Sequence, residues 1–251
     1  MSPYVLEVCV DTWEGAQNAI RNGANRLELC AHLIIGGVSA SPFLFRKLRR
    51  ASDIPIHVMV RPRCGDFLYT DAELEQMLDE VAMWRALGAD GVVTGALTAD
   101  GGLDQAKMQK LRSAAGDSMN FVLHRAFDAS RDALQTLEAA KQVGVTTILT
   151  SGQQPKAVDG LPLIRRLVQR AEGIEIMPGS GVSAQNVALI QSATRASAFH
   201  LSARTQRKSP MRYTRAGLSM GLLGACESDR WDCDPQKVGA IHRVLEDIFS
   251  V

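Results

Sequence analysis

Short apolar runs recur along the whole chain, with starts separated by 21 to 35 residues. Several alternate strictly between apolar and polar positions, which is typical of β-strands. The predicted strands begin at Val5, Arg26, Ile56, Gly91, Asn120, Thr147, Glu175 and Ala198. Between them the apolar period lengthens to about 3.6 residues, which indicates amphipathic helices.

These helices have recognisable boundaries in the sequence. One should follow Asp11, with Glu14 as the partner in a capping box, and another should follow the TDAE box at Thr70. Further helices are expected over 107–115, 133–143, 161–171 and 184–193. Pro235 should open a last one.

Strands that alternate with helices at this spacing predict βα units and a parallel sheet with right-handed crossovers. Eight such units before residue 204 indicate an α/β fold of the (β/α)₈ TIM-barrel type. The alternative, an open doubly wound sheet, normally has a Gly-rich turn after its first strand, and VCVDTWEG is not one. We expect residues 1–251 to form one domain, with a long loop over 204–234 and the Pro235 helix closing the barrel.

Composition excludes several other classes of protein. The chain has 251 residues, 46% of them hydrophobic, and its 28 Lys and Arg nearly balance 27 Asp and Glu. A formal charge of +1 gives no basic field for nucleic acid, and no apolar run approaches the ~18 residues of a membrane span. Five cysteines without a secretory signal favour reduced thiols and a cytoplasmic location. The oligomeric state stays open, a homo-oligomer included.

The polar positions of the first three strands should face the barrel interior, since their aliphatic partners should face the helices. These polar residues are Glu7, Arg26, Glu28, His57 and Arg61. Buried charges must pair or open onto a solvated pocket. Two interpretations follow: a structural Arg–Glu network, favoured for Glu7 and Arg26, or a site at the carboxyl ends of the strands, favoured for Glu28 and Arg61.

The loops after the strands hold candidate anion ligands. Paired guanidiniums at one strand end suit a carboxylate or phosphate, although the loop RPRCGDF could equally be held by internal salt bridges. Glycines beside an expected helix start at Ser183 would free backbone N–H groups for an anion. The predicted anion-binding residues are Arg61, Arg63, Asp66, Arg125, Asp128, Ser151, Gly179, Gly181 and Ser202.

Three residues are candidates for acid–base chemistry, because they lie inward at strand ends. Glu28 is the predicted general base, His124 the complementary acid, and His200 the group that orients ligand or water. Together with Arg61 they are expected to converge on one pocket.

Sulfur ligands are sparse. Cys9 and Cys30 lie on the first two strands, with Met59 on the third, and soft sulfur ligands select Cu(I). Their spacing is not that of a CxxC motif, so small buried side chains are the alternative interpretation.

Several longer motifs resemble those of the CutC family, the so-called copper homeostasis proteins. They are ELCAHLIIGGVSAS, RPRCGDFLYTDAE, VVTGAL, HRAFD, ILTSGQ, GSGV and SPMRYTRAGLSM. The resemblance runs from Leu6 to about Met220 and implies a (β/α)₈ barrel. It also implies a cytoplasmic role in copper handling, with Cu(I) bound through Cys30, while Cys64 departs from the family pattern. Two hypotheses follow: copper(I) binding by Cys30 with Cys9, or an enzyme acting on a small anionic metabolite at the barrel mouth.

Overall fold

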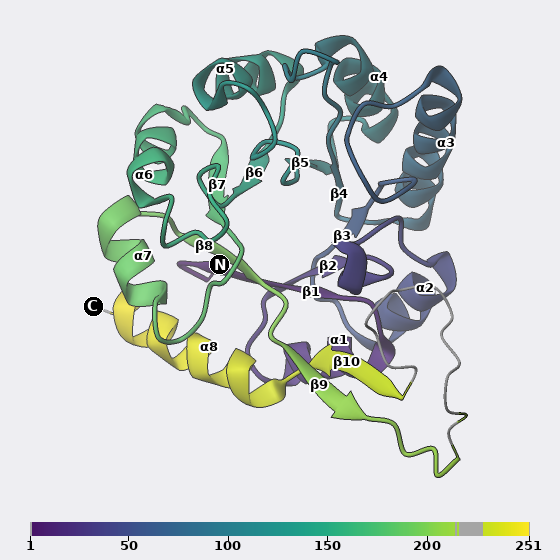
Figure 1. Cartoon of the computed structure of the whole chain (residues 1–251), viewed down its shortest axis with the longest axis vertical. Helices are drawn as coiled ribbons and strands as arrows, with labels where there is room; N and C mark the ends of the chain where they lie inside the picture. The colour runs from purple at the N-terminus through teal and green to yellow at the C-terminus, as the bar shows by residue number, and fades with distance from the viewer. Residues whose placement is uncertain (1, 214, 216–227, 251) are drawn as a thin grey trace.

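The computed structural model describes residues 2–213, 215 and 228–250, which form an α/β barrel (Figure 1). The strands of the barrel are β1 (Val5–Val10), β2 (Arg26–Leu29), β3 (Ile56–Met59), β4 (Gly91–Thr94), β5 (Asn120–Leu123), β6 (Thr147–Thr150), β7 (Glu175–Pro178) and β8 (Ala198–Leu201). The helices are α1 (Trp13–Arg21), α2 (Pro42–Ala51), α3 (Asp71–Leu87), α4 (Gln105–Ala115), α5 (Ala133–Val143), α6 (Leu161–Arg170), α7 (Val187–Thr194) and α8 (Pro235–Phe249). In this part of the chain, no helix combines the length and the apolar composition needed to cross a membrane.

The eight strands run parallel in the order β7-β6-β5-β4-β3-β2-β1-β8. The two outermost strands of this order, β7 and β8, also contact each other, so the barrel is nearly closed. The helices surround it on the outside (Figure 1). The (β/α)₈ barrel predicted from the sequence pattern is therefore confirmed.

Side-chain alternation divides each strand between two environments. On β1, Leu6 and Val8 are fully buried in the main hydrophobic core between the strands and the helices. Glu7 and Cys9 point the other way, into the barrel. Register then aligns the interior groups, because Glu7 pairs with both Arg26 and His200 across the neighbouring strands.

The helix starts follow local capping chemistry, with one difference from the prediction. The capping box at Thr70 forms with Glu73. The first helix, in contrast, is capped by the Thr12 side chain, which accepts from the Gly15 N–H, so the box expected between Asp11 and Glu14 is wrong. Asp11 lies one residue too early and instead accepts a hydrogen bond from the backbone of Leu33.

The helix α2 was not among the predicted elements. Ser41 caps it, Pro42 occupies its first turn, and it buries only Phe45 and Leu48. Its remaining surface is largely charged, and Phe43 is 77% exposed. The sequence carried signals for this helix that the prediction missed: a Ser–Pro start, and Leu44, Phe45 and Leu48 on one face.

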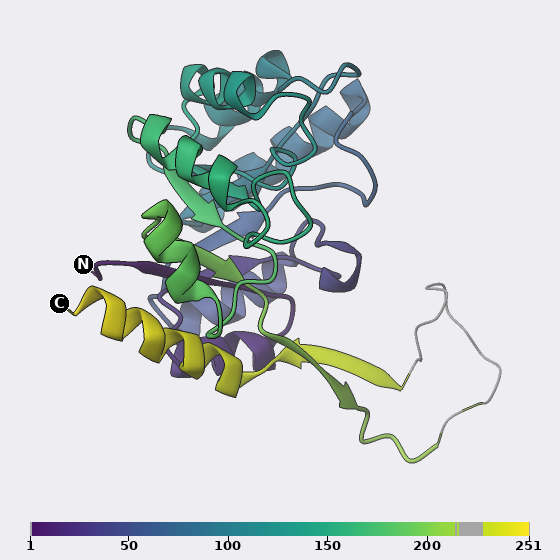
Figure 2. The same cartoon turned by 60° about the vertical axis from the view of Figure 1, so that its left-hand side comes forward.

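The long loop expected over 204–234 contains an antiparallel pair, β9 (Arg204–Lys208) and β10 (Asp229–Cys233), so the prediction of a loop is wrong for these residues. The pair projects from the barrel beside α1 (Figure 2). Asp232 anchors it by accepting a hydrogen bond from the Thr12 hydroxyl. Residues 214 and 216–227, and with them Cys226, lie outside the described residues.

Glycines make room for histidine rings inside the barrel. A methyl group on Gly91 of β4 would lie 2.6 Å from Cδ2 of His57 and 2.9 Å from Cβ of Asn120. One on Gly95 would lie 2.8 Å from the ring of His124. The interior is thus packed to the point at which a single added methyl forces a rearrangement.

Gly91→Ala should therefore destabilise the fold by about 1–3 kcal/mol, the usual cost of overpacking. Urea unfolding followed by circular dichroism measures this loss. Gly102→Ala is the matched control, since a methyl there would meet nothing closer than 3.4 Å. Equal stability of the two variants would show that the barrel interior has free space beside His57.

Candidate functional site

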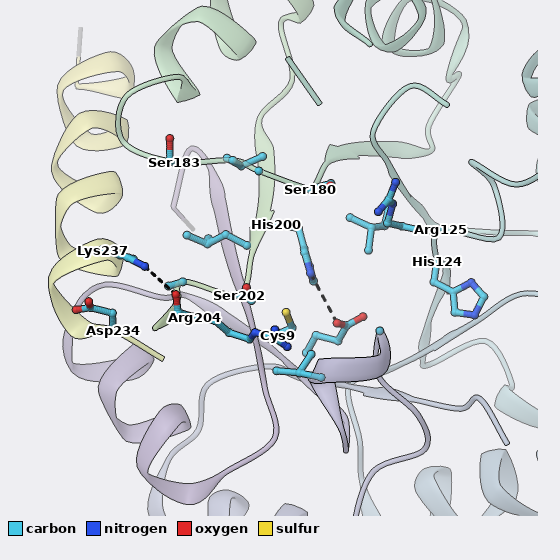
Figure 3. A pocket seen from close by; sticks show the side chains of 18 of the residues that line it. Cys9, His124, Arg125, Ser180, Ser183, His200, Ser202, Arg204, Asp234 and Lys237 are labelled. Atoms are coloured by element: carbon cyan, nitrogen blue, oxygen red, sulfur yellow. Dashed lines mark hydrogen bonds and ion pairs between the residues drawn. The ribbon is translucent and has the colours of Figure 1, made fainter. Parts of the chain in front are cut away.

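A cavity of about 900 Å³ lies at the carboxyl ends of the barrel strands (Figure 3). The predicted site residues that line it are Cys9, Glu28, Arg61, His124, Arg125, Gly181, His200 and Ser202. The structure thus brings together the four side chains expected to converge on one pocket, Glu28, Arg61, His124 and His200. A cavity of this size accommodates a small metabolite.

Below the cavity lies an ion network centred on Glu7, which is completely buried. The Arg26 Nε donates to Glu7 at 2.6 Å, and Nδ1 of His200 lies 2.8 Å from its other oxygen. Nδ1 of His57 lies 3.4 Å from Oε2 of Glu7, the oxygen that Arg26 contacts. Burial alone would raise the pKa of Glu7, but Arg26 and His200 outweigh it and hold the pKa well below its usual range. Glu7 and Arg26 therefore form a buried structural ion pair, the interpretation that the sequence favoured for these two residues.

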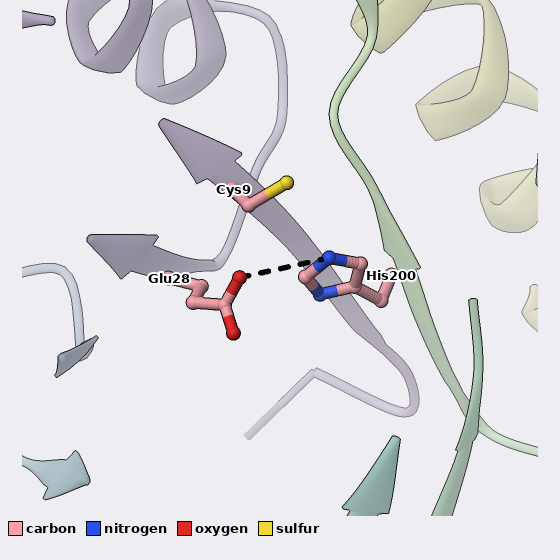
Figure 4. Close-up of side chains that lie close together, drawn as sticks. All are labelled: Cys9, Glu28 and His200. Atoms are coloured by element: carbon pink, nitrogen blue, oxygen red, sulfur yellow. Dashed lines mark ion pairs between the residues drawn. The ribbon is translucent and has the colours of Figure 1, made fainter. Parts of the chain in front are cut away.

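Directly above this network, Cys9, Glu28 and His200 form a compact buried cluster (Figure 4). Their ligand-type atoms all lie within 4.8 Å of one another, and His200 Nε2 is 3.8 Å from Glu28 Oε2. Burial raises the pKa of Glu28 to about 7; the attraction of His200 opposes the shift, and the charge of Glu7 adds to it. Burial would lower the pKa of His200, but Cys9, Glu28 and Glu7 raise it well above its usual value.

The opposite wall of the cavity carries Arg61 and His124. Arg61 is fixed by donating to the carbonyls of Gly37 at 2.9 Å and Gly65 at 2.8 Å, while its Nε has no partner among the described residues. Burial and, after it, the charge of Arg61 lower the pKa of His124 to about 3. Since His124 Nδ1 accepts from the Ala126 N–H at 3.2 Å, the neutral ring carries its hydrogen on Nε2, which is buried without a described partner.

The loop after β7 supplies backbone to the cavity rim. Ser180 and Gly181 both have positive φ, of 73° and 72°, which turns the chain sharply beside the cavity. The helix expected from Ala184 with Ser183 as its cap is wrong at its start, because α7 begins at Val187. Residues 184–186 form a turn in which the Asn186 side chain accepts from the Ser183 N–H.

Two predicted anion ligands in the third loop point away from the cavity. Arg63 is engaged by Glu73 at 2.5 Å and by Asp66 at 3.0 Å. Neither Arg63 nor Asp66 lines the cavity. Arg63 and Asp66 therefore take part in salt bridges within the loop, the alternative that the sequence had left open.

The loops after β5 and β6 are braced in a similar way. Asp128 accepts from the Arg125 Nε at 2.8 Å and from the Ser151 hydroxyl at 3.0 Å. Arg125 also donates to the Ser151 hydroxyl at 2.8 Å, and it lines the cavity, whereas Asp128 and Ser151 do not. Gly179 is also outside the lining; a methyl group there would meet Leu149 at 2.5 Å.

The two inward cysteines have different surroundings. Cys9 faces the cavity, whereas Cys30 is packed with Met59, Val93 and Val122, and its thiol donates to the Val10 carbonyl at 3.6 Å. Burial, followed by the charge of Glu28, raises the pKa of Cys30 well above its usual value. The three-ligand cluster within the described residues contains Cys9 and not Cys30.

Two cations of the cavity rim were missed by the sequence reasoning. Arg204 begins β9 and Lys237 lies in the first turn of α8, and both line the cavity (Figure 3). Lys237 donates to the Arg204 carbonyl at 2.7 Å, and the Arg204 guanidinium lies 5.2 Å from the centre of the Trp231 ring. Their position just after the eighth strand and at the start of the last helix could have indicated them, because loops at the carboxyl ends of barrel strands line the active sites of such barrels.

The chain is similar to known proteins over most of its length. The family model described as "CutC family" matches residues 4–205. The "Copper homeostasis protein cutC homolog" of Homo sapiens is 39% identical over 98% of this chain and 90% of its own. The family protein CutC of Pasteurella multocida is 40% identical over 96% of this chain and 98% of its own.

Solved structures agree with the sequence comparison. The putative copper homeostasis protein CutC from Streptococcus agalactiae is similar with a TM-score of 0.73 and 28% identity, covering 79% of this chain and 98% of its own. KGPDC from Streptococcus mutans is similar in fold alone, with a TM-score of 0.61 at 12% identity over 99% of this chain and all of its own. The matched family model and the relatives at about 40% identity show that the chain belongs to the CutC family.

Proposed function

We propose that this CutC-family barrel is a cytoplasmic enzyme that acts on a small metabolite bearing a phosphate or a carboxylate. The observation that carries the proposal is the convergence of Glu28, Arg61, His124 and His200 on one cavity of about 900 Å³. Polar groups gathered at the carboxyl ends of barrel strands are typical of active sites. A protein that only carries a soft metal has no need of two histidines and several arginines around one cavity.

The anion would bind at the outer part of the cavity. Ser180, Gly181 and Ser202 offer backbone and hydroxyl groups there, and Arg204 and Lys237 add positive charge on the same side. Arg61 or Arg125 would close over the opposite side of the anion. Arg61 suits this role because it is already rigidly held and keeps its Nε free of described partners.

The reacting part of the metabolite would then lie against Glu28 and His124. Glu28 Oε1 is buried and has no described hydrogen-bond partner, so it is the oxygen placed to take a proton from the ligand. His124, expected from the sequence to be an acid, is neutral here and would instead donate a hydrogen bond from Nε2 to a ligand oxygen that gains negative charge. His200 would orient the ligand or a water molecule.

A second candidate function, Cu(I) binding through Cys30, is favoured by a specific contact as well as by the names of the relatives. A methyl group placed on Gly37 would lie 3.6 Å from the Cys30 Sγ and 3.7 Å from the terminal methyl carbon of Met59, and the two side chains pack in one small cluster, so they are neighbours. Thiolate and thioether are ligands that Cu(I) prefers. Cu(I) would enter as cargo and displace the thiol proton of Cys30.

The arginine role predicts a loss of phosphate binding in the double variant Arg61→Ala, Arg125→Ala. Phosphate should raise the unfolding temperature of the wild type, and this increment should be lost, because each charge-assisted hydrogen bond contributes about 1.5–3 kcal/mol, or about ten- to a hundred-fold in affinity. Differential scanning fluorimetry against phosphate concentration measures it. Arg165→Ala on the exposed surface of α6 is the control. Full protection of the double variant would remove these arginines from any anion site.

The neutral state of His124 predicts a titration behaviour. The unfolded histidine titrates near pH 6.5, whereas the folded side chain has a pKa of about 3. The unfolded state therefore binds this proton first, and His124 should make the fold less stable as the pH falls below 6.5 towards 3. In histidine-ring NMR between pH 8 and 5, assigned by comparison with His124→Gln, its resonances should not move. A midpoint near 6.5 would contradict the neutral donor role.

The Cu(I) candidate predicts that Cys9→Ser and Cys30→Ser together abolish stoichiometric Cu(I) binding. Competition with a chromophoric Cu(I) chelator without oxygen measures the affinity. Cys64→Ser, at an exposed thiol away from the cavity, should bind like the wild type. Unchanged affinity in the double variant would eliminate this function.

A further inference from the structure

Cys9, Glu28 and His200 come from three adjacent strands, β1, β2 and β8. Register brings them together: Cys9 is aligned with Glu28, and Glu7, two residues before Cys9, is aligned with His200. All three side chains are buried, with at most 8% exposure, and their ligand-type atoms lie within 4.8 Å of one another (Figure 4). We propose that this cluster binds a divalent cation of the zinc type, through one sulfur, one imidazole nitrogen and one carboxylate oxygen.

The spacing of the three groups fits such a cation. Bonds of about 2.0–2.3 Å around a tetrahedral zinc separate neighbouring ligand atoms by about 3.3–3.8 Å. The Nε2 of His200 and the Oε2 of Glu28 are 3.8 Å apart. Small side-chain adjustments therefore close the remaining gap to Cys9.

The imidazole is held in the orientation that a metal ligand requires. A histidine that binds a metal usually donates its other ring N–H to a carboxylate. Here Nδ1 of His200 lies 2.8 Å from Glu7, which is itself fixed by Arg26 at 2.6 Å. This leaves Nε2 of His200 directed at Glu28, where the cation would take the place of the Nε2 proton.

The weakly compensated charge of the Glu28 carboxylate also indicates a cation. Glu28 is 3% exposed, and its Oε1 has no hydrogen-bond partner in the described part of the chain. A buried carboxylate without a compensating partner is costly. A cation bound through Oε2 would compensate the charge of the carboxylate and leave Oε1 for the proton transfer proposed above. On binding, Cys9 would release its thiol proton and His200 the proton on Nε2 to solvent, so that one thiolate and one carboxylate neutralise the two positive charges of the cation.

The donor set distinguishes this site from a Cu(I) site. Cu(I) prefers soft sulfur ligands, whereas a mixture of sulfur, nitrogen and oxygen suits Zn²⁺ or Co²⁺. Three protein ligands leave a fourth position, and these three residues line the cavity, so that position would open towards His124 and Arg61. This metal site would belong to the proposed enzyme. Only the role of the metal, that of a Lewis acid beside the bound anion, rests on the proposed function.

Titration of the metal-free, full-length protein with Co²⁺ tests the site without any substrate. One equivalent should bind and produce the thiolate-to-cobalt charge-transfer absorption in the near ultraviolet, and Zn²⁺ should displace it. Cys9→Ser should lose this absorption. Glu28→Gln should bind at least about tenfold more weakly, since even the groups that orient metal ligands are worth about 10–100-fold in affinity.

Cys30→Ser is the matched control, because Cys30 is also a buried thiol, directly follows β2 and lies outside the cluster. It should keep the cobalt absorption of the wild type, and circular dichroism should confirm that each variant is folded. An absent charge-transfer band in the wild type, or a band that survives Cys9→Ser and disappears in Cys30→Ser, would overturn the site. Phosphate protection involves no metal, so the anion site and the cation site can fail independently.

Discussion

The buried carboxylate of Glu7 is the constraint on which the barrel interior depends. It lies at 0% exposure among Arg26, His57 and His200, and it can stay ionised there only because these neighbours replace water. The same contacts hold the His200 ring at a fixed angle on β8. Removing the Glu7 charge would leave the buried Arg26 with only Glu175, 3.1 Å away, as a carboxylate partner, and would release the ring at the base of the cavity.

From this network the electrostatics of the cavity follow. Glu28 lies deep in the protein, so burial raises its pKa to about 7; the attraction of His200 opposes this shift and keeps the two side chains close, and the ionised Glu7 below adds to the shift. Across the cavity, the fixed positive charge of Arg61 adds to burial in keeping His124 neutral. One wall therefore offers a base and ligand atoms, and the other offers hydrogen-bond donors, a division that suits polarising a bound oxygen.

The loops around the mouth show why similar residues take different roles. Arg61 and Arg63 are two residues apart, yet Arg61 lines the cavity while Arg63 is drawn outward by Glu73 and Asp66. Arg125 lines the cavity and is braced by Asp128. These ion pairs hold the loops in place, and they engage three of the predicted anion ligands, Arg63, Asp66 and Asp128, within the protein.

The sequence by itself determined the barrel and its interior. Strands with a period of two, separated by amphipathic helices, favour a parallel α/β barrel. Alternation along each strand placed Glu7, Glu28 and His57 inside it, because adjacent side chains of a strand face opposite ways. Only the tertiary structure decided what these groups touch. The register of β1 between β2 and β8 put Cys9 rather than Cys30 beside His200, and the attachment of β10 to Thr12 brought Arg204 to the rim. These contacts join residues about 200 positions apart, and no local pattern encodes such a distance; it is set by how the strands close around the barrel.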